Sequence, residues 1–99
     1  MKLALVVHNE YHTSKMMALL TNAGIDYYTR WTRAEGKGHG TEPHTGKGGF
    51  PSTNTVVMIA FREDGPLKAL ISEIEAANAE ITRPADKFRL FAVPLERMV

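Results

Sequence analysis

The sequence has 99 residues, a formal net charge of +1 and no cysteine. A chain of this length builds one hydrophobic core, so we expect a single domain over residues 1–99. The balanced charge includes no basic run that would indicate a nucleic-acid partner. The lack of cysteine excludes disulfides and thiolate chemistry and fits a reducing compartment. Because no apolar stretch is as long as a membrane span and no signal peptide is recognisable, we expect a cytoplasmic protein without membrane insertion.

The first third of the chain predicts a strand, a helix and a second strand. Residues 3–7 are a short apolar run, typical of a strand buried on both faces. Residues 13–23 carry apolar side chains at helical spacing, with Thr13 or Ser14 as the N-cap. Residues 25–33 alternate and are rich in aromatic and β-branched side chains, which predicts a strand with one solvated face.

The second half of the chain predicts another strand, helix and strand. Residues 55–61 form an apolar run of strand length. A helix is expected to begin near Pro66, because proline suits the first turn. Its apolar side chains recur at helical spacing, at Leu67, Leu70, Ile71, Ile74 and Ala77. Residues 88–93 return to strand character before Pro94.

The resulting order βαββαβ is typical of the ferredoxin-like α+β fold. In that fold, a four-stranded antiparallel sheet carries both helices on one face. The opposite face has no covering element within the chain. Since apolar side chains on such a face must be buried against something, we expect the chain to associate with copies of itself.

The segment 35–53, between the second and third strands, holds six of the eight glycines. Glycine adds no side chain to a core and leaves the backbone free, so this composition predicts a long flexible loop. Loops beyond about 12–15 residues are uncommon in compact domains and usually serve a site or a partner. We therefore expect this chain to act through segment 35–53.

Placed in the βαββαβ order, this segment resembles the T-loop of the PII signalling proteins. The run Glu-Gly-Lys-Gly-His-Gly at 35–40 resembles the entry to that loop, and Arg-Leu-Phe-Ala-Val-Pro at 89–94 resembles the strand that closes the PII core. The resemblance covers nearly the whole chain. It implies a homotrimer that binds ATP, ADP or AMP as an effector in clefts between subunits, with no obligatory cofactor. It further implies regulation of a protein target, such as a membrane transporter or a metabolic enzyme, through the loop.

The chain also departs from the PII pattern. No tyrosine lies between Gly36 and Thr53, so the tyrosine that is uridylylated in enteric-type PII proteins has no counterpart. PII proteins carry Thr-Gly and then Gly-Asp-Gly-Lys before the last strand, whereas residues 82–89 read Thr-Arg-Pro-Ala-Asp-Lys-Phe-Arg. The sequence ends at Val99, before the paired arginines of longer members. We therefore expect a short PII-like protein, and a sensor linked to bicarbonate or carbon metabolism stays open as a more specific alternative.

A set of glycines and cations forms the candidate nucleotide site. Glycine lets backbone amides approach phosphate oxygens closely, and lysine and arginine supply the opposite charge. In the resemblance, Thr82 and Arg89 correspond to the threonine and phosphate-facing lysine of PII proteins, and His39 stands where the family often has an arginine. The full candidate set is Gly36, Lys37, Gly38, His39, Thr82, Arg83, Lys87 and Arg89. These glycines and cations could instead be only flexible and solvated.

A metal-responsive binding protein is the alternative of a different class. His39, Glu42 and His44 lie within six residues and offer imidazole and carboxylate ligands for a transition metal. In the PII-like interpretation, Glu42, His44 and an apolar anchor, Phe50, instead belong to the partner-binding loop. His8 and His12 straddle a strand-to-helix turn and are expected to be solvated or hydrogen-bonded edge residues.

Enzymatic and nucleic-acid functions have little support. No carboxylate pair has a spacing suited to acid–base catalysis and no nucleophile motif is present, so we expect no catalytic residues. The aromatic side chains Tyr27, Tyr28 and Trp31 could stack on RNA bases, but intersubunit packing explains them better. We therefore predict a non-enzymatic, nucleotide-binding regulatory protein.

Overall fold

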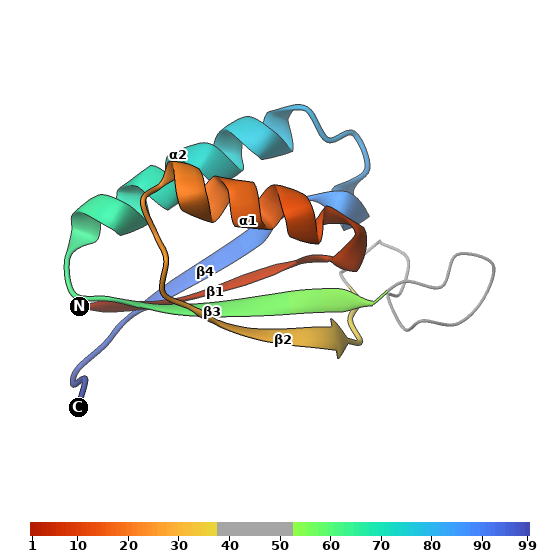
Figure 1. Cartoon of the computed structure of the whole chain (residues 1–99). Helices are drawn as coiled ribbons and strands as arrows, with labels where there is room; N and C mark the ends of the chain where they lie inside the picture. Colours follow the sequence, from red (N-terminus) through yellow and green to blue (C-terminus); the bar gives the residue numbers. More distant parts are fainter. Residues whose placement is uncertain (38–52) are drawn as a thin grey trace.

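The computed structural model describes residues 1–37 and 53–99. One antiparallel sheet holds the four strands in the order β2-β3-β1-β4. Both long helices lie on the same face of this sheet (Figure 1). The predicted ferredoxin-like βαββαβ fold is therefore confirmed. In chain order the elements are β1 (Lys2–Asn9), the 3-10 turn η1 (Glu10–His12), α1 (Thr13–Asn22), β2 (Thr29–Ala34), β3 (Asn54–Phe61), α2 (Asp64–Ala79), the 3-10 turn η2 (Pro84–Asp86) and β4 (Arg89–Pro94).

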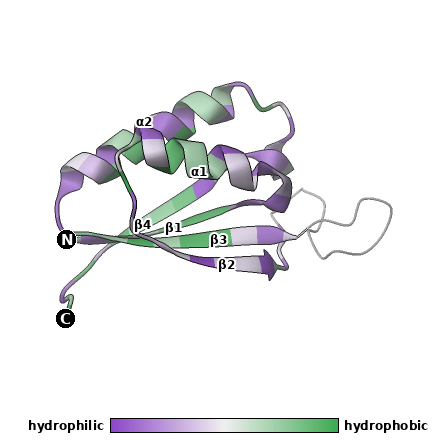
Figure 2. Ribbon diagram, viewed as in Figure 1, coloured by the Kyte–Doolittle hydropathy of each residue, from purple (hydrophilic) through white to green (hydrophobic). Residues whose placement is uncertain are grey.

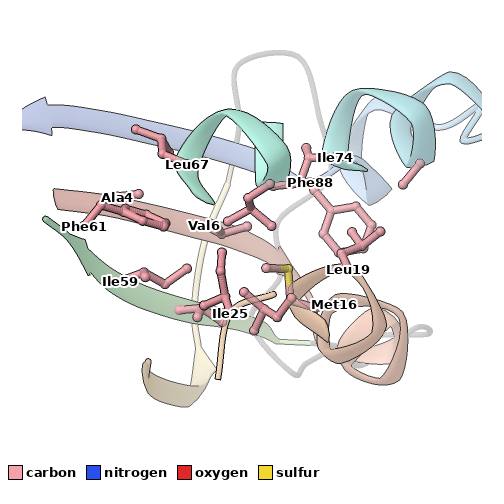
Figure 3. Close-up of a cluster of buried hydrophobic side chains, with 14 residues drawn as sticks. Ala4, Val6, Met16, Leu19, Ile25, Ile59, Phe61, Leu67, Ile74 and Phe88 are labelled. Atoms are coloured by element: carbon pink, nitrogen blue, oxygen red, sulfur yellow. The ribbon is translucent and has the colours of Figure 1, made fainter. Parts of the chain in front are cut away.

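The hydrophobic core lies between the sheet and the two helices (Figure 3). On β3 every second side chain is buried, because successive strand residues point to opposite faces of the sheet. Val57 lies opposite Val6 of β1 and Ile59 opposite Ala4, so the buried rows of the two central strands coincide. Fully burying an aliphatic side chain of this kind stabilises the fold by about 1.5–3 kcal/mol. The helices add Met16, Leu19 and Leu20 from α1, and Leu67, Leu70, Ile74 and Ala77 from α2.

The other face of the sheet has no covering element among the described residues (Figure 1). Leu5 lies at its centre, opposite Met58 of β3 and Phe91 of β4. Phe91 and Val93 keep about half of their surface exposed, at 51% and 52%. Apolar colouring continues along β1, β3 and β4 (Figure 2). The prediction that the first strand is buried on both faces is therefore wrong for the described residues of the single chain, because no helix or strand among them covers this face and Leu5 keeps 36% of its surface exposed.

The second strand begins later than predicted, at Thr29 instead of residue 25. Gly24 adopts a positive φ of 75°, and the amide of Ile25 donates a hydrogen bond to the carbonyl of Leu20. This turn sends Ile25 into the core, where it is 4% exposed, so residues 25–28 connect the helix to the sheet. The strand is also irregular near its end, since the register with β3 shifts between Trp31 and Ala34 and Arg33 has a φ of 58°.

The first helix does not use the predicted cap. Thr13 is its first residue, and the N-cap position falls on His12, whose side chain makes no capping hydrogen bond. The capping residue lies earlier, before the 3-10 turn η1 that leads into the helix. There the side chain of Asn9 accepts a hydrogen bond from the amide of Tyr11 at 3.0 Å. The Thr13 hydroxyl donates instead to the carbonyl of Glu10 at 2.8 Å. Within residues 1–37 and 53–99, neither helix is long and apolar enough to span a bilayer.

Candidate functional site

A pocket of about 370 Å³ lies at one end of the sheet, where β1 ends and β3 and β4 begin. The residues after β2 and the turn η2 complete its wall. Its volume falls in the range of small-molecule sites. Its lining combines apolar, charged and polar side chains with one glycine: Val7, His8, Ala34, Glu35, Gly36, Lys37, Asn54, Val56, Pro84, Ala85, Lys87, Arg89 and Phe91.

The two ends of segment 35–53 meet at this pocket. Ala34 lies opposite Asn54, and the Asn54 side chain approaches Gly36 so closely that a Cβ on Gly36 would overlap its amide nitrogen. Glu10 ties down the returning chain, because its amide donates to the Thr53 carbonyl at 2.9 Å and its Oε1 accepts from the Thr53 amide at 3.3 Å. A side chain at position 36 would therefore have to displace the Asn54 amide, in addition to any effect on a ligand.

A hydrogen-bonded clamp sets the position of the cationic wall. The Asn78 side chain at the end of α2 donates to the Phe88 carbonyl and accepts from the Phe88 amide, both at 2.8 Å. Phe88 is 1% exposed and anchors the chain in the core. Its neighbours Lys87 and Arg89 line the pocket on either side of this anchor. The Arg89 guanidinium carbon lies 5.7 Å from the centroid of the Phe91 ring, within the range of a cation–π contact.

A hydrogen bond joins η2 to the end of β1. The Asn9 side chain donates to Asp86 Oδ1 at 3.4 Å, a long hydrogen bond. Asp86 also pairs with Arg83, whose Nε lies 3.8 Å from Asp86 Oδ2. Arg83 is largely exposed in this pair and does not line the pocket. The Arg83 side chain therefore lies largely at the surface, and the charged residues that line the pocket are the cations Lys37, Lys87 and Arg89 and the acidic Glu35.

His8 is buried in the wall of the pocket, with 2% of its surface exposed. Its ring packs against Phe88 with centroids 5.3 Å apart, and its Nδ1 lies 2.8 Å from the Asn9 carbonyl. Burial is the main cause that lowers the pKa of His8; nearby His12 and Arg30 act in the same direction, while the bond to Asn9 opposes them. The expectation of a solvated or edge position is wrong for His8, because β1 continues to Asn9 and turns this side chain inward.

The structure brings together four of the eight predicted nucleotide-site residues. Gly36, Lys37, Lys87 and Arg89 all line the pocket, although they come from two segments far apart in the chain. Thr82 and Arg83 do not line it. The predicted residues Gly38, His39, Glu42, His44 and Phe50 lie outside the described residues.

Sequence reasoning missed three residues that shape the site. His8 and Asn54 line the pocket, and Glu10 holds the chain next to Asn54. An asparagine just before an apolar run offers no signal of a site. The alternation of residues 3–7, continued by two positions, could have placed His8 on the buried row of β1.

Metal binding has no support in the described part of the chain. Across residues 1–37 and 53–99, no three histidine, aspartate or glutamate side chains are grouped so as to hold a metal ion. The predicted ligands His39, Glu42 and His44 lie outside these ranges. The metal-responsive alternative therefore stays a prediction from sequence.

Comparison with solved structures identifies the fold as that of PII-like proteins. One is CPII, a nitrogen regulatory PII-like protein from Thiomonas intermedia K12, bound to ADP, AMP and bicarbonate. It is 15% identical, with a TM-score of 0.69 over 97% of this chain and 88% of that one. A second structure of CPII, bound to ADP and bicarbonate, is 17% identical, with a TM-score of 0.65 and the same coverage. No protein-family model matches the sequence, and no curated protein matches it significantly. The chain therefore has the fold that its resemblance to PII proteins predicted.

Proposed function

We propose that this chain is a non-enzymatic PII-like sensor that binds an adenine nucleotide in the pocket at the end of its sheet. The observation that carries the proposal is the convergence of Gly36, Lys37, Lys87 and Arg89 on one pocket. Three cationic side chains against the single carboxylate of Glu35 leave the lining with an excess of positive charge, which suits a polyphosphate because charge-assisted hydrogen bonds to phosphate are stronger than neutral ones.

The lining of the pocket suits the rest of a nucleotide as well. Val7, Val56 and Phe91 give it an apolar side, and the Phe91 ring offers a surface on which a planar base can stack. Small-molecule sites typically combine such an apolar wall with a few polar groups that fix orientation. The two CPII structures support the same ligand class, since both contain ADP and one also contains AMP.

We propose that the working form is a homotrimer in which a second subunit closes the pocket. The open sheet face offers the interface, because it exposes apolar side chains that water solvates poorly. Trp31 is 50% exposed on β2, and Phe91 and Val93 are similarly exposed on β4 at the opposite edge. Phe91 belongs to this face and also lines the pocket, so subunit contact and ligand binding would meet at this side chain.

Regulation of a protein target through segment 35–53 completes the proposal. Both ends of the segment are fixed at the pocket, by Gly36 against Asn54 and by Glu10 bonded to Thr53. A ligand that contacts Gly36 and Lys37 therefore acts at the base of the segment. Ligands bias a conformational equilibrium only through different contacts with its states, and this base is where such contacts would be made. A membrane transporter or a metabolic enzyme is the expected target.

Isothermal titration calorimetry tests the nucleotide-binding part. ATP, ADP and AMP should each be titrated into the purified protein, with GTP as the control for the base and inorganic pyrophosphate as the control for the phosphates. We expect saturable heat with at least one adenine nucleotide and one site per chain. No heat with any of the three up to millimolar concentration would reject the proposal.

Bicarbonate is a second candidate effector. Both CPII structures contain bicarbonate beside nucleotide. Bicarbonate is a small anion, so the positive charge that attracts phosphate to the pocket would attract bicarbonate as well. Titrating ADP in the presence and absence of bicarbonate, with chloride as the matched anion, measures this coupling. Equal ADP affinity in the two buffers would exclude a linked bicarbonate site.

A further inference from the structure

The end of β1 carries a buried asparagine whose side chain uses both of its polar atoms. Asn9 is 6% exposed. Its Oδ1 accepts from the Tyr11 amide at 3.0 Å, and its Nδ2 donates to Asp86 Oδ1 at 3.4 Å. A backbone amide can only donate, so the first contact identifies the oxygen of the Asn9 side chain. Its nitrogen then faces the carboxylate of Asp86, which accepts. The two contacts together fix the orientation of the Asn9 side chain.

The bond between Asn9 and Asp86 restrains one of the cations of the pocket. Lys87, which lines the pocket, lies between two anchored residues. Phe88 on one side is buried and is held by the Asn78 clamp. Asp86 on the other side is held by Asn9. Without the bond to Asn9, the backbone that leads into Lys87 has one restraint fewer.

The opposite wall of the pocket is connected to the same residue through β3. Asn9 lies directly opposite Asn54 in the pairing of β1 with β3, and the Asn54 side chain contacts Gly36. Gly36 and Lys37 line the pocket on this side. Groups that bind one ligand must be held within about 0.5 Å of the geometry that the ligand requires. The separation of the two walls therefore depends on how each is held to Asn9.

We propose that Asn9 is a positioning residue of the nucleotide site, which holds Lys87 through Asp86 at the place where its ammonium group meets the phosphates. This inference rests on the proposed function and adds to it a residue outside the pocket, since neither Asn9 nor Asp86 lines it. Charge-assisted hydrogen bonds to phosphate depend on the position of the donor. Loss of the bond between Asn9 and Asp86 therefore weakens nucleotide binding through Lys87.

Two substitutions at Asp86 separate positioning from charge. Asp86→Ala removes the acceptor for Asn9 and also a negative charge next to Lys87, so electrostatics alone would strengthen ADP binding. We expect ADP to bind roughly threefold to tenfold more weakly instead, the range for one hydrogen bond. Asp86→Asn removes the same charge but keeps an oxygen that accepts from Asn9, and should bind ADP at least as tightly as the wild type. Both variants lose the ion pair with Arg83, so that pair explains no difference between them.

A substitution of Asn9 tests the same bond from the side of the sheet. Asn9→Asp keeps an acceptor for the Tyr11 amide but places a second carboxylate against Asp86. ADP affinity should fall at least as far as in Asp86→Ala. The double variant Asn9→Asp/Asp86→Asn should regain most of it, because the amide at position 86 then donates to the carboxylate at position 9. Asn22→Asp is the matched control, since Asn22 donates to the Glu73 carboxylate at 3.5 Å at an exposed position, and it should bind ADP like the wild type.

A double-mutant cycle with Lys87 provides a readout that a general loss of structure would not give. Calorimetry measures ADP affinity in all variants, and thermal unfolding reports any loss of fold. If Asn9 acts through Lys87, Asp86→Ala should cause little further loss of affinity in the Lys87→Ala background. If Asp86→Ala does not fold, Asn9→Asp and its rescue by Asp86→Asn decide the question.

Three results would overturn the inference while leaving the nucleotide site in place. The first is equal ADP affinity of Asp86→Ala and Asp86→Asn. The second is an undiminished effect of Asp86→Ala in the Lys87→Ala background. The third is a double variant that binds no better than Asn9→Asp alone. If the wild type binds no nucleotide, the proposed function itself fails.

Discussion

Asn54 and Gly36 lie against each other at the base of segment 35–53, so that a Cβ on residue 36 would overlap the amide nitrogen of the Asn54 side chain. We predict that Gly36→Ala displaces the Asn54 amide, costs about 1 kcal/mol of unfolding free energy and weakens nucleotide binding, because both residues line the pocket. Urea denaturation and calorimetry measure the two effects. Gly65→Ala is the control: it lies in the first turn of α2 with open space around it, and should be neutral or stabilising by about 0.5–1 kcal/mol. The same loss in both variants would contradict the steric explanation.

The Asn78 clamp is predicted to contribute strongly to stability. Asn78→Ala removes both hydrogen bonds to Phe88 and leaves a part-buried amide and carbonyl without their partner. We expect a loss of about 2–3 kcal/mol in the free energy of unfolding. Asn78→Asp keeps the acceptor for the Phe88 amide and should lose less. Asn22→Ala is the control, since its contact with Glu73 is exposed and 3.5 Å long, and it should change the free energy by less than about 0.5 kcal/mol.

His8 is predicted to make the free energy of unfolding depend on pH. Its pKa in the folded state is lowered, so the unfolded chain, with an imidazole pKa near 6.5, takes up the proton more readily. The stabilisation is therefore complete above about pH 6.5 and is lost as the pH falls through 6.5 toward the lower folded pKa, at no more than about 1.4 kcal/mol per pH unit. Urea denaturation between pH 7.5 and 5 measures this slope. His8→Gln should flatten it; an unchanged slope would assign the effect to another group.

Arg89 is predicted to bind phosphate directly. Arg89→Glu should weaken ADP binding roughly tenfold to hundredfold, since a charge-assisted hydrogen bond is lost and a repulsion is added. Lys68→Glu, on the exposed side of α2, changes the net charge equally and should have little effect. Calorimetry at two salt concentrations compares the variants. Equal losses would mean that the field of the whole chain, and not a contact with Arg89, attracts the nucleotide.

The open sheet face is predicted to be the subunit interface. Leu5→Lys places a charge among the apolar side chains at its centre, so the trimer should dissociate. Sedimentation velocity should then give a species near the 11.0 kDa chain mass instead of three times that value. Ala69→Lys, exposed on α2, is the control and should stay trimeric. A wild-type protein that sediments as a monomer at all concentrations would reject the interface.

The sequence by itself determined the order of the elements and the fold. Apolar runs of strand length and the repeat in α2 are local patterns, so they could be recognised without knowing what they pack against. The ends of elements were predicted less well. Ile25 looked like part of a strand but turns into the core, and Thr13 looked like a cap but is helical, because tertiary contacts and a preceding 3-10 turn decide both.

The tertiary structure decided which predicted residues share a site. Register and crossover bring Gly36 and Arg89, 53 positions apart in the sequence, to the same end of the sheet, whereas Arg83 turns to the surface to pair with Asp86. The contacts of the His8 ring with Phe88 and of its Nδ1 with the Asn9 carbonyl could not be predicted either, because they depend on tertiary packing and on the turn that follows β1. The residue types in the sequence show which functional groups the chain has, but tertiary packing decides which of these groups contact one another and which line a pocket.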